Sequence, residues 1–414
     1  MEEKNSEKKE RKMRDSGIPW IGEVPEGWEF SKIKYHCTMK SGDNITALDI
    51  SDNGEYPVYG GNGLRGFYKI YNKNGNHILI GRQGALAGNV HLVNGKFWAT
   101  DHAVIVTLKN DVFINYFFRM LESMNLNQYA FDTAAQPGLS VSRIMNLNIV
   151  LPNLKEQHRI ADFLGSKCSE IDTLIENLRA CMESAKEYKK AVITEAVTKG
   201  LDKDAKMKDS GVEWIGEIPE GWKVVRFKHI ASIKSNLVQP DKYMKYPQIA
   251  PDNIEKDTGR LLSHQTVEES GVISGNHLFY RGQILYSKIR PNLNKLTVAP
   301  FDGLCSADMY PIESKLPTLF MVYSMLSTYF VSQVSLIIQD RVKMPKINQE
   351  ELGEIKVAVP SQQEMLTIAD YLDSKCSEID ALLQNYEYQI ATLEEYKKSL
   401  IYEYVTGKKE VPEA

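Results

Sequence analysis

Residues 153–200 read NLKEQHRIADFLGSKCSEIDTLIENLRACMESAKEYKKAVITEAVTKG, and this stretch decides the fold. It contains no proline and one internal glycine, so it predicts a single helix of roughly 45 residues, about 70 Å long at ~1.5 Å per residue. Asn153 with Glu156 three residues later predicts an N-cap and a capping box, and Pro152 ends a preceding strand. Gly200 suits a left-handed C-terminal cap.

Apolar residues in this stretch recur in steps of four and three, which is the heptad seam of a coiled coil. Residues 361–407 repeat the seam at an offset of 208, with Ser361 and Glu364 as a second capping box and Gly407 as a second cap. The seam of the first copy is Leu164, Cys168, Ile171, Ile175, Leu178, Met182, Ala185, Lys189, Val192 and Ala196. That of the second copy is Leu372, Cys376, Ile379, Leu383, Tyr386, Ile390, Leu393, Lys397, Leu400 and Tyr404.

The two seams predict that the helices pack on each other. Lys189 and Lys397 interrupt them at the same place, and a polar residue at one core position can fix the register. The alternative is that each helix packs only on its own domain. We expect the pair, because two matched seams in one chain complement each other.

A second repeat opens each half of the chain. DSGIPWIGEVPEGWEF at 15–30 returns as DSGVEWIGEIPEGWKV at 209–224, and four of the five tryptophans lie in these segments. We interpret them as a Trp-Pro clasp that fixes the start of each domain against the preceding helix, with a docking surface as the alternative. This repeat has an offset of 194, so the second domain is 14 residues longer than the first.

The repeats predict an α+β chain of two similar α/β domains separated by two long helices that pair with each other as a coiled coil. Both domains contain strands broken by glycine-rich turns, a short helix, and a final strand before the long helix. The expected boundaries are a disordered charged tail at 1–14, a first domain at 15–152, a helix and linker at 153–208, a second domain at 209–360, a helix at 361–407 and a tail at 408–414.

The charge distribution favours nucleic acid, although the net charge is −4. Residues 56–100 and 270–301 contain no Asp or Glu, and their basic residues are interleaved with Tyr, Asn, Gln and Gly. Such stretches attract phosphates and can contact base edges, whereas a solvated basic face is the alternative. The predicted DNA-binding residues are Arg65, Lys69, Lys73, Arg82, Gln83, Gln136, Lys288, Arg290, Asn292, Lys295, Arg341, Lys343 and Lys346.

The sequence lacks most of the motifs that are typical of enzymes. The chain has no G-x-x-x-x-G-K-[ST] loop and no Asn-Pro-Pro-aromatic tetrapeptide, and no His pair flanks a Glu at i, i+4. Glu354-Ile-Lys356 has the spacing of a nuclease E-x-K, with Pro251-Asp252 far upstream. We therefore expect no catalytic residues, no metal and no cofactor.

The five cysteines have no metal-ligand spacing, and there is no signal peptide or membrane-spanning apolar run, which favours a cytoplasmic protein with reduced thiols and no membrane partner.

From Asp15 onward the chain resembles the specificity (S) subunits of type I restriction–modification systems. The resemblance rests on the two W-I-G-x-[VI]-P-x-G-W segments, on LPNLKEQHRIADFL and VPSQQEMLTIADYL at the starts of the long helices, and on the half-repeat. GRQGALAG…FWATDHAVIV and ILYSKIRPNL…CSADMYPI also resemble segments of target recognition domains. The second helix has Gln363-Glu364-Met365 where the first has Lys155-Glu156-Gln157, so its usual Glu-Gln pair is incomplete.

The resemblance implies a non-catalytic subunit whose two target recognition domains each bind half of a split double-stranded DNA site. It implies that the two long helices pair as an antiparallel coiled coil, set the length of the unspecified spacer and dock two methyltransferase (M) subunits. Restriction (R) subunits then join that complex. Two other readings stay open at this point. One is a self-contained endonuclease that uses Glu354 and Lys356, and the other is a coiled-coil scaffold whose domains bind protein or sugar.

Overall fold

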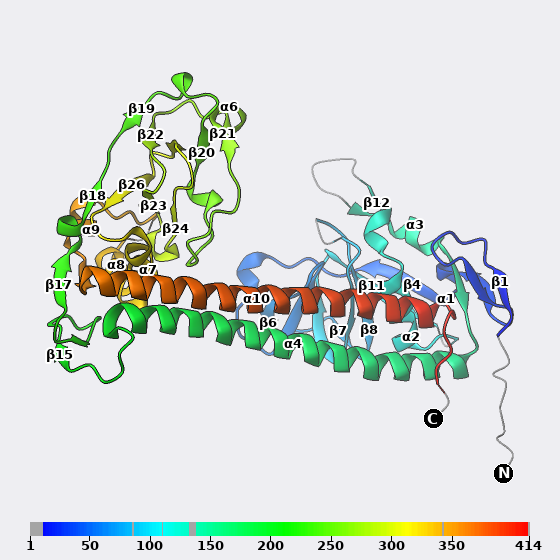
Figure 1. Ribbon diagram of the computed structural model, residues 1–414. Coiled ribbons are helices and arrows are strands. Elements are labelled where there is room, and N and C mark those ends of the chain that lie inside the picture. Colours follow the sequence, from blue (N-terminus) through cyan, green and yellow to red (C-terminus); the bar gives the residue numbers. More distant parts are fainter. Residues whose placement is uncertain (1–10, 85–86, 110, 132–137, 342, 413–414) are drawn as a thin grey trace, which may run out of the picture. The chain divides into compact units, whose positions relative to one another are not determined.

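The computed structural model describes residues 11–84, 87–109, 111–131, 138–341 and 343–412 (Figure 1). The chain divides into two compact units, which are treated separately here. Unit 1 contains residues 1–178 and 388–414, and unit 2 contains residues 179–387. Each unit therefore holds one mixed domain and parts of both long helices.

The two long helices are present as predicted. Helix α4 spans Leu154–Lys199 (46 residues) and α10 spans Gln362–Val405 (44 residues). Both N-caps form, since Asn153 Oδ1 accepts from the Glu156 amide at 3.0 Å and Ser361 Oγ accepts from the Glu364 amide at 3.3 Å. Gly200 and Gly407 end the helices at φ of 73° and 72°, the left-handed conformation that glycine adopts without strain.

The reciprocal half of each predicted capping box is wrong, because the two glutamates are engaged elsewhere. The Glu156 carboxylate accepts a hydrogen bond from Arg11, and Glu364 Oε1 accepts one from Trp222 Nε1 at 3.1 Å. Each carboxylate thus ties the start of a long helix to another segment of its own unit.

The seams are buried as the heptads predict. In unit 1 the first half of α4 shares a hydrophobic core with the last turns of α10, and in unit 2 the last turns of α4 share a core with the first half of α10. The two helices therefore pair antiparallel, which confirms the fold class. Buried seam residues are Leu164, Cys168, Ile171, Ile175, Val192, Ala196, Leu372, Cys376, Ile379, Leu400 and Tyr404, whereas Leu178, Leu383 and Leu393 are half-buried.

In its described residues, unit 1 contains two four-stranded sheets and three two-stranded pairs. The sheets run β4 (Cys37–Ser41), β11 (Ala103–Leu108), β8 (His77–Gly81), β9 (Val90–Val93), and β6 (Gly63–Tyr68), β5 (Tyr56–Gly60), β10 (Lys96–Ala99), β7 (Lys73–Asn74). The pairs are β1 (Met13–Asp15) with β2 (Glu23–Pro25), β3 (Glu29–Lys32) with β14 (Asn148–Leu151), and β12 (Ala130–Phe131) with β13 (Gly138–Leu139). Its shorter helices are α1 (Ile33–His36), α2 (Ile114–Ser123) and α3 (Val141–Met145), with 3-10 turns η1 (Ala47–Asp49) and η2 (Leu126–Tyr129).

The part of unit 2 that the structure describes contains a four-stranded sheet, a five-stranded sheet and two two-stranded pairs. The sheets run β18 (Ala231–Ile233), β26 (Met309–Ser314), β23 (Ile284–Ser287), β24 (Leu296–Val298), and β19 (Leu237–Val238), β22 (Asn276–Phe279), β25 (Gly303–Cys305), β20 (Pro247–Ile249), β21 (Gln265–Thr266). The pairs are β15 (Met207–Asp209) with β16 (Glu217–Pro219), and β17 (Lys223–Arg226) with β27 (Lys356–Val359). Its shorter helices are α5 (Phe227–Ile230), α6 (Val267–Ser270), α7 (Thr318–Leu326), α8 (Thr328–Ile338) and α9 (Gln349–Glu354), with 3-10 turns η3 (Pro240–Lys242), η4 (Pro251–Asn253) and η5 (Pro291–Leu293).

The two domains share one frame despite their dissimilar interiors. The order β4-β11-β8-β9 in unit 1 matches β18-β26-β23-β24 in unit 2, with every neighbour antiparallel in both. Each unit also contains one parallel pair, β5 with β10 and β20 with β25. Residues of one domain can therefore be matched to residues of the other by their place in this frame.

The tryptophan clasp is confirmed for the second domain and corrected for the first. Trp222 is buried, and its ring lies 3.2 Å from where a Cβ on Gly200 would stand, so the second domain packs on the end of the preceding helix. Trp28 is equally buried but packs at Gly407, where a Cβ would meet its ring at 2.9 Å. The first domain therefore packs on the end of α10, which lies last in the sequence.

Part of the predicted disordered tail is structured. Strand β1 begins at Met13 and pairs with β2. Arg11 binds Glu156, and Arg14 donates to the Trp28 carbonyl at 2.5 Å. These partners order residues 11–14, while residues 1–10 lie outside the described part.

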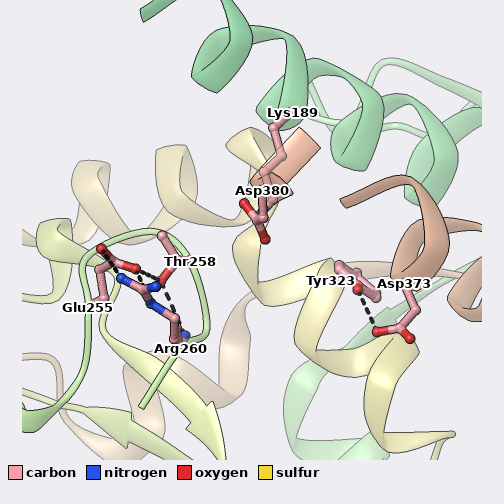
Figure 2. Close-up of polar contacts among 7 residues, drawn as sticks. All are labelled: Lys189, Glu255, Thr258, Arg260, Tyr323, Asp373 and Asp380. Carbon is pink, nitrogen blue, oxygen red and sulfur yellow. Dashed lines mark hydrogen bonds and ion pairs between the residues drawn. The ribbon is translucent and has the colours of Figure 1, made fainter. Parts of the chain in front are cut away.

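The short helix expected in the second domain is broken into α7 and α8 at Ser327. Ser327 is extended, at ψ 153°, and its hydroxyl donates to the Ser324 carbonyl at 2.6 Å, while the Thr328 amide donates to Thr194 Oγ1 of α4 at 2.9 Å. On α7, Tyr323 also donates to Asp373 of α10 at 3.4 Å (Figure 2). Among the described helices none is by itself long and apolar enough to cross a membrane; α7 and α8 reach that length only jointly, across a 59° bend.

Candidate nucleic-acid interface

In unit 1 the predicted residues Arg82 and Gln83 form the exposed turn that follows β8. The Arg82 amide donates to the His102 carbonyl at 2.9 Å, and its own carbonyl accepts from the Leu139 amide at 2.9 Å. Arg82 Nη1 donates to Ser41 Oγ at 3.1 Å, and Gln83 forms a β-bridge with Gly138. The backbone of this turn is therefore fixed on two sides, while both side chains are exposed.

The glycine-rich loop at 60–63 lies beside this turn. A Cβ on Gly61 would stand 3.1 Å from the His102 carbonyl oxygen and 3.6 Å from the Arg82 amide nitrogen. Gly63, at φ +90°, lies over the ring of His91. Close backbone approach thus requires the glycines, and it places the GGNG and GRQG segments side by side.

In unit 2 the predicted residues Lys288 and Arg290 occupy the corresponding turn after β23. The Lys288 amide donates to the Asp308 carbonyl at 2.9 Å, and this hydrogen bond is equivalent to the one from the Arg82 amide to the His102 carbonyl in unit 1. The Arg290 amide donates to the Pro345 carbonyl at 2.8 Å, and Ile289 forms a β-bridge with Lys346. Arg290 is exposed and left-handed, at φ 44°, an uncommon conformation for a residue other than glycine.

Both units therefore join two segments that are distant in the sequence by an equivalent β-bridge. The turn after β8 or β23 pairs with the loop before α3 or α9, and predicted residues from both segments meet there in unit 2. Gln136 was predicted in the corresponding loop of unit 1 but lies outside the described residues. One residue of each bridge belongs to a stretch without Asp or Glu, namely 56–100 or 270–301. The other residue of each bridge belongs to the loop before the last short helix of the domain.

The remaining predicted residues of unit 1 lie on the sheet that contains β5. Arg65 is exposed on β6, with its side chain over Gly60, and Lys69 is exposed just after β6. Lys73 begins β7 and is half-buried. Nearby, Lys96 Nζ lies 4.9 Å from the centre of the Tyr71 ring, a cation–π contact at the surface.

Several predicted residues of unit 2 have intramolecular partners. Lys346 Nζ donates to Asp308 Oδ1 at 3.3 Å, and Lys288 Nζ lies 5.5 Å from the centre of the Tyr310 ring. Lys295 Nζ donates to the Pro251 carbonyl at 2.8 Å and lies 3.7 Å from Asp252. Arg341 binds Glu351 and the Lys346 carbonyl, and this hydrogen bond lowers the pKa of Glu351. Lys295 and Arg341 thus brace the loops that carry their exposed neighbours, namely Asn292, Lys343 and Lys346. Their predicted contacts with DNA stay predictions.

The nuclease alternative gains no support from the geometry. Glu354 binds Lys228 and lies 3.2 Å from Arg226, and the Lys228 hydrogen bond lowers its pKa. Asp252 has Lys295 as its neighbour instead. Within the described ranges, no three His, Cys, Asp or Glu side chains lie close enough together to hold a metal ion.

One further constellation has the hydrogen-bond order of a hydrolytic triad. His36 Nδ1 lies 2.6 Å from Asp111 Oδ2, and His36 Nε2 lies 2.6 Å from Ser31 Oγ. Ser31 lies within the paired strand β3, and the adjacent cavity of about 500 Å³, at Lys109 and Val112, is lined by none of the three residues. We therefore assign them a structural role that fastens α1 to the segment before α2.

The chain is similar to several known proteins. Residues 25–180 match the family described as "Type I restriction modification DNA specificity domain". The chain is 34% identical over 267 residues to the Type I restriction enzyme EcoDI specificity subunit of Escherichia coli, covering 60% of each protein. It is 28% identical to the MjaVIII specificity subunit of Methanocaldococcus jannaschii, covering 93% of each.

The match to the first of these relatives spans less than two thirds of that protein, whereas the match to the second spans nearly all of it. Among solved structures, a chain described under "Structural basis underlying complex assembly and conformational transition of the type I R-M system" shares the fold, with a TM-score of 0.65 at 16% identity. That superposition covers 93% of this chain and 99% of the solved one. By sequence the chain is similar to the specificity subunits of type I restriction–modification systems, and it shares its fold with a solved chain of such a system.

Proposed function

We propose that the chain is the DNA-recognition subunit of a type I restriction–modification complex, in which each domain reads one half of a bipartite double-stranded site. The observation that carries this proposal is the repeated β-bridge. In both units it holds a turn on a braced backbone, with exposed Arg82 and Gln83 in one unit and half-buried Lys288 and exposed Arg290 in the other. Exposed Arg and Gln side chains on a fixed backbone suit contacts with phosphates and with the major-groove edges of bases, and a neighbouring Lys suits contacts with phosphates.

The proposed domains are residues 15–152 and 209–360, and their contents differ while their frame is shared. Different side chains on one frame would recognise different half-sites. The long helices run from one unit into the other, so we propose that their length sets the unspecified spacer between the half-sites.

The helices also present two equivalent surface patches that we propose as docking sites for two methyltransferase subunits. SKCSEID at 166–172 is identical to the segment at 374–380, and EYKK at 187–190 is identical to that at 395–398. Each SKCSEID segment faces the EYKK segment of the other helix, as the Lys397–Asp172 and Lys189–Asp380 contacts show. Much of the repeated surface is exposed, so internal packing alone does not explain its identity.

The patch of unit 1 contains Lys167, Leu174 and Tyr396, and that of unit 2 contains Lys375, Leu382 and Tyr188. Leu174, Tyr396, Leu382 and Tyr188 are all exposed. Hydrogen bonds to Glu170 and Glu378 raise the pKa of the two lysines, with a smaller contribution from the neighbouring tyrosine in each patch. Two copies of one surface suit two copies of one partner.

In this proposal the chain itself is not catalytic and holds no cofactor. Methyl transfer would belong to the M subunits, and DNA cleavage to R subunits that join through M. The test is to co-express the chain with its M subunits and to map the methylated positions by sequencing. A bipartite motif with a fixed spacer is the expected result, whereas methylation without a sequence preference, or DNA cleavage by the purified chain alone that Glu354→Ala abolishes, would contradict the proposal.

A further inference from the structure

One loop of unit 1 and one loop of unit 2 occupy the same place in the shared frame, although their sequences are not similar. In unit 1 the Tyr59 carbonyl, at the parallel pair of β5 and β10, accepts from the Thr100 amide at 2.9 Å. In unit 2 the Ile249 carbonyl, at the parallel pair of β20 and β25, accepts from the Ser306 amide at 2.9 Å. Residues 60–63 therefore correspond to residues 250–253, and Asn62 corresponds to Asp252.

Both loops lie next to the basic turn of their domain. In unit 1, Gly61 packs against the backbone of Arg82 and His102. In unit 2, Lys295 contacts the loop through the Pro251 carbonyl at 2.8 Å, and its own carbonyl accepts from the Ser287 amide, one residue before Lys288. The side chains at the two loop tips thus lie on the face that we propose to contact DNA.

Each loop tip is rigid and presents one polar side chain. Asn62 is exposed between glycines that pack on neighbouring backbone and on His91, and its side-chain Oδ1 accepts from Asn89 Nδ2 at 3.3 Å. Asp252 lies in the 3-10 turn η4, which Asn253 closes by accepting from the Ala250 amide at 2.7 Å. The Asp252 side chain is fully exposed, at 103%.

The carboxamide of Asn62 and the carboxylate of Asp252 suit hydrogen bonds with different bases. A carboxylate repels phosphates, so an exposed aspartate on a DNA-facing loop is unfavourable unless it accepts a hydrogen bond from a base. In the major groove the amino group of cytosine offers that donor, whereas an Asn amide can both accept from and donate to adenine. Lys295, 3.7 Å from Asp252, reduces the repulsion.

We infer that Asn62 and Asp252 are corresponding base-reading residues, Asn62 for an adenine in one half-site and Asp252 for a cytosine in the other. This inference rests on the proposed function and deepens it. The sequence analysis could not predict Asp252, because it selected basic residues in stretches that contain no Asp or Glu.

The experiment uses the full chain in complex with its M subunits and a DNA library in which both half-sites are randomised. Asn62→Ala should reduce the preference at one base pair of one half-site by about 5- to 150-fold and leave the other half-site unchanged. Asp252→Ala should do the same at one pair of the opposite half-site. Asn62→Asp should shift the preferred base towards cytosine, and Asp252→Asn should shift it towards adenine.

Asn115→Ala, on the exposed face of α2, and Asp204→Asn, in the exposed linker after α4, are matched controls that should leave both half-sites unchanged. Unaltered assembly with the M subunits shows that a variant is folded, and Asp252→Asn preserves the shape of the side chain if the alanine variant fails. Unchanged base preferences, or equal weakening on every sequence, overturn the inference while leaving the proposed function intact. A wild-type complex that selects no bipartite sequence overturns both.

Discussion

Lys189 of α4 extends across the helix pair to Asp380 of α10, with Nζ at 2.6 and 2.7 Å from the two carboxylate oxygens (Figure 2). In unit 1, Lys397 of α10 binds Asp172 of α4 in the same way, at 2.6 and 2.8 Å. Both lysines are largely buried, with 12% and 21% of their side chains exposed, whereas each aspartate is half-exposed. The polar interruptions of the seam are thus two copies of one ion pair, each of which fixes the register in its own unit.

Breaking one pair should weaken the fold modestly. Lys189→Ala, Asp380→Ala and the double variant should give a coupling of about 0.5–1 kcal/mol in the free energy of unfolding, because the aspartate is half-exposed and solvent screens the pair. Denaturant unfolding measures this. The matched control is the exposed pair of Lys186 and Glu183 within α4, for which about 0.3–0.5 kcal/mol is expected. A coupling free energy of zero between Lys189 and Asp380 would contradict the hypothesis that this ion pair fixes the register of the helices.

Base and phosphate contacts can be separated by their dependence on sequence. If Arg82 or Arg290 reads a base, its change to Ala should cost ~1–3 kcal/mol and relax one position of one half-site. Lys73→Ala, if Lys73 binds phosphate, should weaken binding to all sequences similarly and lower the salt slope by about one. Binding titrations at several salt concentrations, on cognate and mismatched sites, measure both effects. Equal losses on every sequence for both Arg variants would identify them as backbone anchors.

The docking patches predict a change of stoichiometry. Leu174→Ala with Tyr396→Ala removes the apolar part of the unit 1 patch, so the complex should retain one M subunit instead of two. Leu382→Ala with Tyr188→Ala should remove the other, and all four changes should abolish assembly. Native mass spectrometry counts the subunits. Tyr388→Ala is the control, because Tyr388 is exposed on α10 outside either patch. Two M subunits on the fourfold variant would contradict the docking proposal.

Asp257 predicts a dependence of stability on pH. It lies in the loop that Glu255, Thr258 and Arg260 fasten by hydrogen bonds (Figure 2), and burial raises its pKa, with Lys190, 3.9 Å away, opposing the shift. A raised pKa in the folded state means that the protonated form favours folding. That contribution is full below the ordinary pKa of aspartate and is lost as the pH rises through the raised value.

Asp257→Asn should therefore raise Tm at pH 7, and the difference from the wild type should shrink as the pH falls towards 4, near the ordinary pKa of aspartate (~3.9). Asparagine also tolerates the left-handed backbone of this residue, at φ 61°. Thermal unfolding at several pH values measures the effect, with Asp204→Asn in the exposed linker as control. A lower Tm at pH 7 would show that the contact with Lys190 outweighs the cost of burial.

The sequence predicted the frame well because the frame is repeated. Heptads, caps and the two tryptophan segments are local patterns, so α4, α10 and their packing on each other followed from spacing. The antiparallel direction of the pair followed from the family resemblance. The partner of Trp28 did not follow, because packing on the end of α10 joins residues nearly four hundred positions apart. Glu156 and Glu364 left their capping boxes for the same reason, since distant Arg11 and Trp222 compete for the carboxylates.

Charge alone could predict the candidate interface only in part. The acid-free stretches pointed to Arg82 and Lys288, but nothing local indicates that Ile289 bridges Lys346. Likewise, the sequence could not separate exposed Arg290 from Arg341, which binds Glu351. Such distinctions depend on side-chain partners that the fold brings together from other segments.

The helix pair predicts that spacer length follows helix length. Seven residues added after Leu178 of α4 and seven after Tyr386 of α10 preserve both seams and keep each Lys–Asp pair intact, since Asp172 with Lys397 and Lys189 with Asp380 stay on the same sides of the insertions. The pair lengthens by roughly 10 Å, which is about three base pairs at ~3.4 Å each. Three base pairs also turn the duplex by about 100° at ~10.5 pairs per turn, so the DNA or the domains must twist.

We therefore expect the double insertion to recognise unchanged half-sites with a spacer longer by about one to three base pairs and with weaker binding. Inserting seven residues in α4 alone is the matched control. It shifts one seam against the other and separates Lys189 from Asp380 or Asp172 from Lys397, so the chain should lose stability instead of gaining a longer spacer. Methylation mapping of both variants in complex with the M subunits measures the outcome. An unchanged spacer in a folded, active double-insertion complex would mean that something other than the helix pair sets the distance between the half-sites.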